Sequence, residues 1–113
     1  MISNNVKTKW AKKETVLNSF LSIANPFTAE IMSEQGYDAL TIDHQHGMIA
    51  FNDVLAMLQS IRSSGVTPIC RVSGLDHSVI SKVMDAGALG VICPMINNRA
   101  QAEQLVQDCK YPP

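Results

Sequence analysis

Apolar residues along this chain gather in four short runs, and each run is followed by a segment that favours a helix. The runs span residues 15–23, 37–42, 68–72 and 90–95, and they predict four strands. The segments between and after them predict helices over residues 28–35, 51–61, 77–86 and 99–109. The chain therefore reads as a strand followed by a helix, repeated four times.

The expected helix ends carry matching capping signals. Asp76 and Asn98 stand where an N-cap is needed, and Gln101 occupies the capping-box position after Asn98. Gly65 and Gly87 stand just past the last apolar positions of two helices, where a glycine commonly ends a helix. These signals support the helix boundaries that the apolar pattern predicts.

The order of elements favours an α/β fold with a parallel sheet. No hairpin signal separates the strands, and parallel strands need crossover connections such as these helices. The short strands lack polar alternation, as expected when both faces of a sheet are covered. An open doubly wound sheet would carry a glycine-rich turn after its first strand, and residues 23–26 (IANP) are not one. We therefore predict the first half of a TIM (β/α)8 barrel, since a full barrel takes roughly 250 residues.

On this prediction, residues 1–113 form the N-terminal part of a single barrel domain, truncated after the fourth βα unit. Composition agrees with a globular chain, because 46% of the residues are hydrophobic and 17% are charged. A formal net charge of −1 argues against a nucleic-acid partner. No apolar run reaches the roughly 20 residues of a membrane helix, and the start does not resemble a secretory signal. A short basic cluster near the start is interpreted as a solvated surface: Lys7, Lys9, Lys12 and Lys13.

The cysteines indicate a reducing, cytosolic environment. Their number is odd, they are widely spaced, and no CxxC pair occurs, so neither a disulfide framework nor a zinc site is predicted. We expect all three to be packed thiols: Cys70, Cys93 and Cys109.

The strongest chemical signal is the segment Asp43-His44-Gln45-His46-Gly47, which follows the second predicted strand. Function in these folds gathers at the carboxyl ends of the strands. An aspartate close to a histidine can hold the imidazole tautomer and raise its basicity for acid–base work. A polar turn without chemistry explains the segment about equally well. A metal-binding His-x-His pair, formed by His44 and His46, is a third interpretation.

Arg71 is the second signal, because it places a permanent cation within or at the end of the third strand. A partly buried guanidinium needs a carboxylate or an anionic ligand beside it. Two interpretations stay open: a structural ion pair with Asp43, or a donor aimed at a substrate oxyanion. Cys70, next to it in the strand, should point to the opposite face, toward the helices.

Four segments resemble, in order, the HpcH/HpaI aldolase family of metal-dependent class II pyruvate aldolases. Residues 36–47 (GYDALTIDHQHG) resemble the second-strand motif of the family, and residues 70–72 (CRV) its arginine-bearing third strand. Residues 85–95 (DAGALGVICPM) are similar to the fourth-strand segment, and residues 110–113 (KYPP) to the start of the loop that follows. The resemblance implies a (β/α)8 barrel that assembles into homo-oligomers.

The resemblance also implies a reaction: reversible aldol cleavage of a 4-hydroxy-2-oxo acid to pyruvate and an aldehyde. His46 would be the acid–base residue, Asp43 its partner, and Arg71 the contact to the pyruvyl oxygen. Gln45 would lie near the outer shell of a divalent cation (Mg²⁺, Mn²⁺ or Co²⁺). The metal-ligating glutamate and aspartate of the family lie on later strands, beyond Pro113. No metal ligand is therefore assigned within this chain, and the chain alone is expected to be inactive.

Two other functions are kept as alternatives. A barrel hydrolase with a metal on His44 and His46 predicts tight zinc binding that His44→Ala abolishes. A non-catalytic half-barrel that serves only as an assembly piece predicts a stable, soluble dimer of the 113-residue chain.

Overall fold

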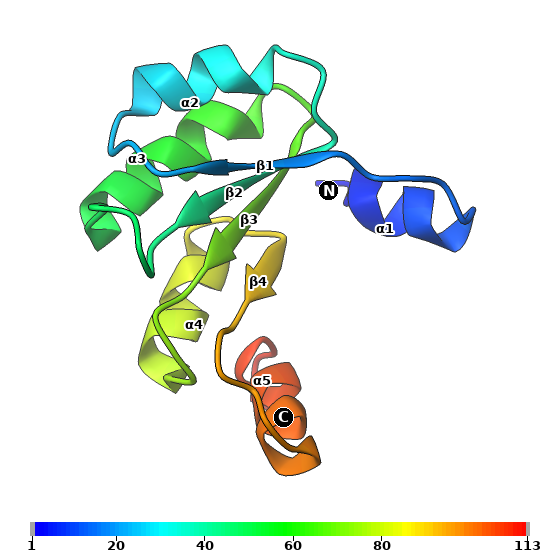
Figure 1. Cartoon of the computed structure of the whole chain (residues 1–113), viewed down its shortest axis with the longest axis vertical. Helices are drawn as coiled ribbons and strands as arrows, with labels where there is room; N and C mark the ends of the chain where they lie inside the picture. The colour runs from blue at the N-terminus through cyan, green and yellow to red at the C-terminus, as the bar shows by residue number, and fades with distance from the viewer. Residues whose placement is uncertain (1, 113) are drawn as a thin grey trace.

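A computed structural model describes residues 2–112, and its centre is one parallel sheet of four strands. The strands follow one another in space in chain order, and every neighbouring pair is parallel (Figure 1). Their bounds are β1 (Asn18–Leu21), β2 (Ala39–Asp43), β3 (Thr67–Arg71) and β4 (Gly90–Ile92). The predicted parallel sheet with helical crossovers is confirmed.

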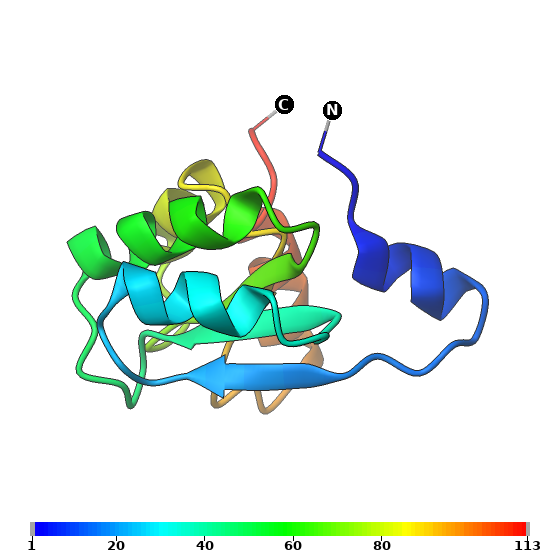
Figure 2. The ribbon, with the colours of Figure 1, turned by 90° about the horizontal axis from the view of Figure 1, so that it is seen from above.

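A helix follows each strand in turn: α2 (Pro26–Ser33), α3 (Phe51–Arg62), α4 (His77–Asp85) and α5 (Arg99–Asp108); the first three provide the crossovers between the four strands. Helices α2, α3 and α4 lie on the same side of the sheet (Figure 2), and α5 packs beside α4. Their apolar stripes bury one continuous core against the strands, which includes Leu40, Ile42, Val54, Leu58 and Ile80. None of the helices in residues 2–112 is long and apolar enough to cross a membrane.

The N-cap and glycine signals are confirmed at the helix ends, but the capping box is not formed, because the Gln101 side chain accepts from the backbone N–H of Asn97 instead of Asn98. The Asp76 side chain accepts hydrogen bonds from the backbone N–H groups of Ser78 and Val79, and the Asn98 side chain accepts one from Gln101. Gly65 and Gly87 have φ angles of +83° and +116°, a left-handed backbone that glycine adopts without steric cost. These local signals therefore place the crossovers with little help from the rest of the fold.

Helix α1 (Asn5–Ala11) was not among the predicted elements. It lies beside the amino ends of the strands, where the Asn4 side chain donates to the Leu89 carbonyl and Asn5 to the Gly65 carbonyl. In the basic cluster, Lys9 pairs with Asp38 at 2.7 Å, just before β2. The cluster is therefore partly an anchor for this helix and not only a solvated surface.

Three strands are shorter than predicted: β2 by one residue, and β1 and β4 by more. Strand β4 ends at Ile92 instead of continuing to Met95, because Pro94 has no N–H to pair and Met95 has a positive φ of 64°. Strand β1 begins at Asn18 instead of residue 15. The residue just before it, Leu17, donates its backbone N–H to the Asp38 side-chain carboxylate at 2.8 Å. The carboxyl ends of the strands, called the carboxyl edge below, thus carry loops that start at positions 22, 44, 72 and 93.

Candidate active site

An ion pair between Asp43 and Arg71 joins the ends of β2 and β3. The two residues are register partners and are the last residues of their strands. Arg71 Nε donates to Asp43 Oδ1 at 3.0 Å, and Arg71 Nη2 donates to Oδ2 at 2.7 Å. This two-point geometry matches the planar guanidinium to the planar carboxylate. The fold therefore contains the first arrangement considered for Arg71, the ion pair with Asp43.

The same carboxylate organises the turn that follows β2. Asp43 Oδ1 also accepts hydrogen bonds from the backbone N–H groups of Gln45 (3.2 Å) and His46 (3.1 Å). A Cβ added to Gly47 would lie 2.3 Å from the Asp43 carbonyl oxygen, so this tight turn requires glycine. The spacing of the Asp43–Gly47 motif thus has a structural cause: one carboxylate holds both Arg71 and the backbone of the turn.

The two histidines of the motif have different environments. The Nδ1 atom of His44 lies 2.8 Å from the Ile49 carbonyl oxygen, and its backbone N–H donates to the Arg71 carbonyl at 3.0 Å. The imidazole of His46 is exposed, and within residues 2–112 no hydrogen bond or ion pair holds its ring. Asp43 thus contacts His46 through the backbone and not through the imidazole. The ring of His46 is free to meet a ligand at the carboxyl edge.

Phe20 on β1 completes the surroundings of Arg71. The Arg71 Cζ atom lies 4.9 Å from the centre of the Phe20 ring, within the range of a cation–π contact. Arg71 remains 26% exposed at its side chain, whereas the Asp43 side chain is only 6% exposed. Sequence reasoning missed Phe20. The sequence does not distinguish the two roles that a large apolar residue near the end of a predicted strand can have, which are packing in the core and a cation–π contact.

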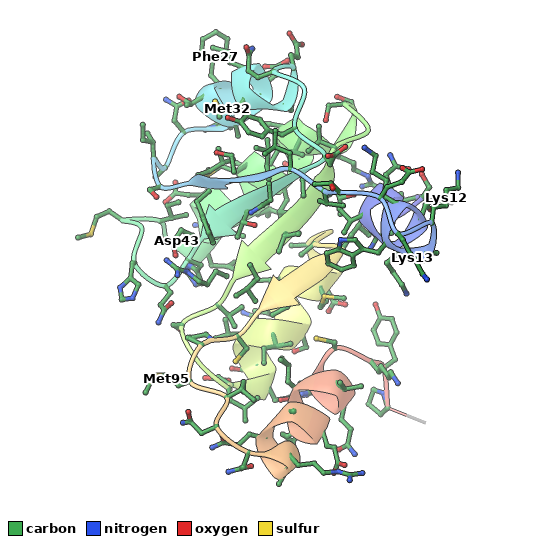
Figure 3. The ribbon with its side chains drawn as sticks, turned by 45° about the vertical axis from the view of Figure 1, so that its right-hand side comes forward. Lys12, Lys13, Phe27, Met32, Asp43 and Met95 are labelled. Atoms are coloured by element: carbon green, nitrogen blue, oxygen red, sulfur yellow. The ribbon has the colours of Figure 1, made fainter. Side chains whose placement is uncertain are left out.

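Figure 3 shows Asp43 at the arrowhead end of β2, and Lys12 and Lys13 at the opposite end of the sheet. The basic cluster and the candidate site therefore lie at different ends of the strands. Gln45 is half-buried in the turn after β2, close to the ion pair through its backbone N–H. The structure thus gathers Asp43, Gln45, His46 and Arg71 at one edge, as the sequence predicts.

The ion pair holds the pKa of the Asp43 carboxyl at about 2, well below its usual range. The hydrogen bonds from Arg71 are the main cause, the backbone N–H groups of His46 and Gln45 add to it, and burial opposes it. The same contact raises the pKa of Arg71. Both groups are therefore charged throughout the neutral range.

Because the pKa of Asp43 is lower in the folded chain, this pair stabilises the fold above about pH 4, the unfolded value. We expect that part of the stability, on the order of 1–2 kcal/mol after solvent screening, to be lost as the pH falls from about 4 to about 2. Urea unfolding at several pH values measures it. Asp43→Asn should flatten this part of the profile, whereas Glu103→Gln, which breaks an exposed pair with Arg99, should leave it unchanged. An identical profile in Asp43→Asn would contradict the assignment.

Within residues 2–112, no group of three or more His, Cys, Asp or Glu side chains gathers in a way that could hold a metal ion. His77, the third histidine, lies away from the site, with its Nδ1 atom 3.1 Å from Asp108 Oδ1. That contact joins the start of α4 to the end of α5. The described residues alone therefore do not fit a metal centre.

The cysteine predictions are confirmed where the structure tests them. Cys70 is fully buried in the core on the helix side, and burial raises the pKa of its thiol to about 12. Cys93 and Cys109 are partly buried against the same core, and burial also raises the pKa of each. All three thiols are free.

Four parallel βα units with a polar cluster at the carboxyl edge match the first half of a TIM-barrel-like enzyme fold. Comparison with known proteins agrees, since residues 17–113 match the family described as HpcH/HpaI aldolase/citrate lyase. The chain belongs to this family.

Individual relatives cover nearly all of this chain. It is 39% identical over 110 residues to a hydroxypyruvate/pyruvate aldolase of Rhizorhabdus wittichii, covering 97% of this chain and 44% of that protein. It is 33% identical over 113 residues to a 2-keto-3-deoxy-L-rhamnonate aldolase of Klebsiella pneumoniae, covering 100% of this chain and 42% of that protein. A crystal structure of an HpcH/HpaI family protein from Burkholderia cenocepacia superimposes with a TM-score of 0.89 at 26% identity, covering 98% of this chain and 44% of that one. The chain thus spans less than half the length of these relatives.

Proposed function

We propose that the whole protein containing this chain is a carbon–carbon lyase. It would cleave a 4-hydroxy-2-oxo acid reversibly to pyruvate and an aldehyde. The observation that supports this proposal is the shared carboxylate: Asp43 Oδ1 accepts from both the Arg71 guanidinium and the backbone N–H of His46, so one group holds the cation and the segment that carries the exposed histidine. The names of the relatives, which are aldolases acting on hydroxypyruvate, pyruvate or keto-deoxy sugar acids, support the same chemistry.

In the proposed reaction, the His46 imidazole accepts the proton of the C4 hydroxyl. The C3–C4 bond then breaks, the aldehyde leaves, and the electron pair of that bond moves into the enolate of pyruvate. The N–H donors of Arg71 that Asp43 does not use stabilise the enolate oxygen as charge develops on it. A proton returned to C3 completes pyruvate. A positioned acid–base group typically contributes about 10²–10⁴-fold to such a step.

Asp43 would serve this reaction through positioning. Its carboxylate holds the guanidinium by two hydrogen bonds and fixes the backbone that presents His46.

Because Asp43 also neutralises Arg71, the pair has no net charge and does not by itself balance the charge of an anionic 2-oxo acid. That charge balance supports the family's requirement for a divalent cation, Mg²⁺, Mn²⁺ or Co²⁺, which would act as a Lewis acid. The described residues lack a ligand set for it, so each step above uses this chain's own side chains. Gln45 would lie near its outer shell.

Two further parts of the proposal concern the protein's setting. Its partner is a small-molecule 2-oxo acid, and the whole protein would form a homo-oligomer in the cytoplasm. The three free thiols are consistent with a reducing compartment. Sedimentation of the whole protein would test the oligomer.

The test is an assay of pyruvate release by the whole protein from a panel of 4-hydroxy-2-oxo acids. We expect release that EDTA abolishes and that Mg²⁺, Mn²⁺ or Co²⁺ restores. Release of pyruvate that EDTA does not affect would contradict the cation requirement alone. No release from any member of the panel, with each cation added to a folded protein, would contradict the proposed activity.

A further inference from the structure

Phe20 and Arg71 meet across one intervening strand of the sheet. Phe20 lies on β1 and Arg71 on β3, and β2 runs between them (Figure 1). The arginine side chain therefore extends over β2, where it meets Asp43, and reaches the aromatic ring at 4.9 Å. In this chain, which spans less than half the length of its relatives, Phe20 is 47% exposed and is not among the residues of the hydrophobic core. The contact with Arg71 places this ring beside the Asp43–Arg71 pair at the carboxyl edge.

The donors of the guanidinium can be counted. An arginine has five N–H donors, and Asp43 takes the one on Nε and one of the two on Nη2. Within residues 2–112, the second N–H of Nη2 and both on Nη1 have no hydrogen-bond acceptor, so these three donors are available to a ligand. The two bonds to Asp43 fix the guanidinium within the plane of the carboxylate. They restrict its tilt out of that plane much less, because a hydrogen bond tolerates a range of angles.

We propose that Phe20 is a positioning residue for Arg71 in the aldol reaction, a role that rests on the proposed function. Its ring face supports the guanidinium from one side, and thereby holds the three free N–H donors toward the oxygen of the developing enolate. Two contacts of different kinds then fix the cation. The Asp43 carboxylate sets its position within the plane, and the Phe20 ring sets the tilt of the plane. A leucine at position 20 supplies apolar volume without a π face, whereas a tryptophan supplies a stronger one.

The experiment compares Phe20→Leu and Phe20→Trp in the whole protein by two readouts. The first is the NMR resonance of the Arg71 Nε–H group, assigned by its loss in Arg71→Lys. A proton near a ring face is shielded, so this resonance should move downfield in Phe20→Leu and stay shielded in Phe20→Trp. The second is pyruvate release, for which kcat/KM should fall roughly 3- to 30-fold in Phe20→Leu, mainly through kcat. Phe20→Trp should restore it to within about 2-fold.

Phe51→Leu is the matched control. Phe51 is a second phenylalanine beside a cation, with its ring centre 5.6 Å from Lys82 Nζ, and it starts α3 away from the Asp43–Arg71 pair. This variant should change neither the Arg71 resonance nor kcat/KM.

Two results would overturn the proposal. One is an Arg71 resonance that does not move in Phe20→Leu. The other is a loss of activity that Phe20→Trp fails to restore, since that would mark a requirement for phenylalanine's size and not for its π face. Failure of the proposed function is distinguishable, because it would appear as absence of pyruvate release in the unsubstituted protein while the resonance still reports the contact.

Discussion

Replacing His46 with alanine in the whole protein is expected to lower kcat for pyruvate release by about 10²–10⁴-fold. The loss reflects the proton that the imidazole accepts from the C4 hydroxyl. Folding should be almost unaffected, with a change of about 0.5 kcal/mol or less in the free energy of unfolding, because the ring is exposed and Asp43 contacts only the His46 backbone. Steady-state kinetics and urea unfolding on the same preparation separate the two effects.

His44→Ala is the control within the same motif. The Nδ1 atom of His44 faces the Ile49 carbonyl, so its loss should loosen the turn without removing an acid–base group. We expect a decrease in kcat of only a few-fold, far smaller than in His46→Ala. Zinc titration of both variants tests the hydrolase alternative, in which His44 and His46 share a metal. A carbonyl at Nδ1 is also common for a metal-bound histidine, so the geometry of His44 alone does not decide between the two. Equal loss of activity in both variants, together with loss of zinc binding in His44→Ala, would favour the hydrolase.

Most of the fold could be predicted from the sequence because its signals are local. Asp76, Asn98, Gly65 and Gly87 mark helix ends through contacts within a few residues, and the apolar strands have no competing pattern. Helix α1 was missed for the opposite reason. Its seven residues include a single buried one, Val6, and its position depends on contacts with residues about 60 and 85 positions away along the chain.

The candidate site was predictable as a set of residues but not as a set of contacts. Asp43 could pair with His46, three positions away, or with Arg71, 28 positions away, and the sequence left both possibilities open. The register of β2 against β3 decides between them, because it places Asp43 directly beside Arg71. The contact between Phe20 and Arg71 is harder still to predict from the sequence. It depends on the spatial order of three strands and on an arginine side chain long enough to cross the middle one.

The other large effect is expected at Arg71. Arg71→Ala removes the donors to the enolate oxygen, which should lower kcat/KM by about 10²–10³-fold. It also leaves the Asp43 carboxylate, with 6% of its side chain exposed, without its cation. Breaking a buried pair from one side is costly, and we expect the free energy of unfolding to fall by about 3 kcal/mol. Chemical unfolding and pyruvate release again measure the two losses.

The double variant Asp43→Asn, Arg71→Ala separates catalysis from stability. Asparagine carries no charge, so no unpaired charge is left buried when the arginine is removed. Its side-chain oxygen can still accept hydrogen bonds from the backbone N–H groups of the turn that Asp43 holds. We therefore expect it to recover about 1–2 kcal/mol of the stability that Arg71→Ala loses. Activity should not return, because no guanidinium faces the enolate. If kcat/KM recovered together with stability, Arg71 would act on the fold alone, and the oxyanion role proposed for it would be wrong.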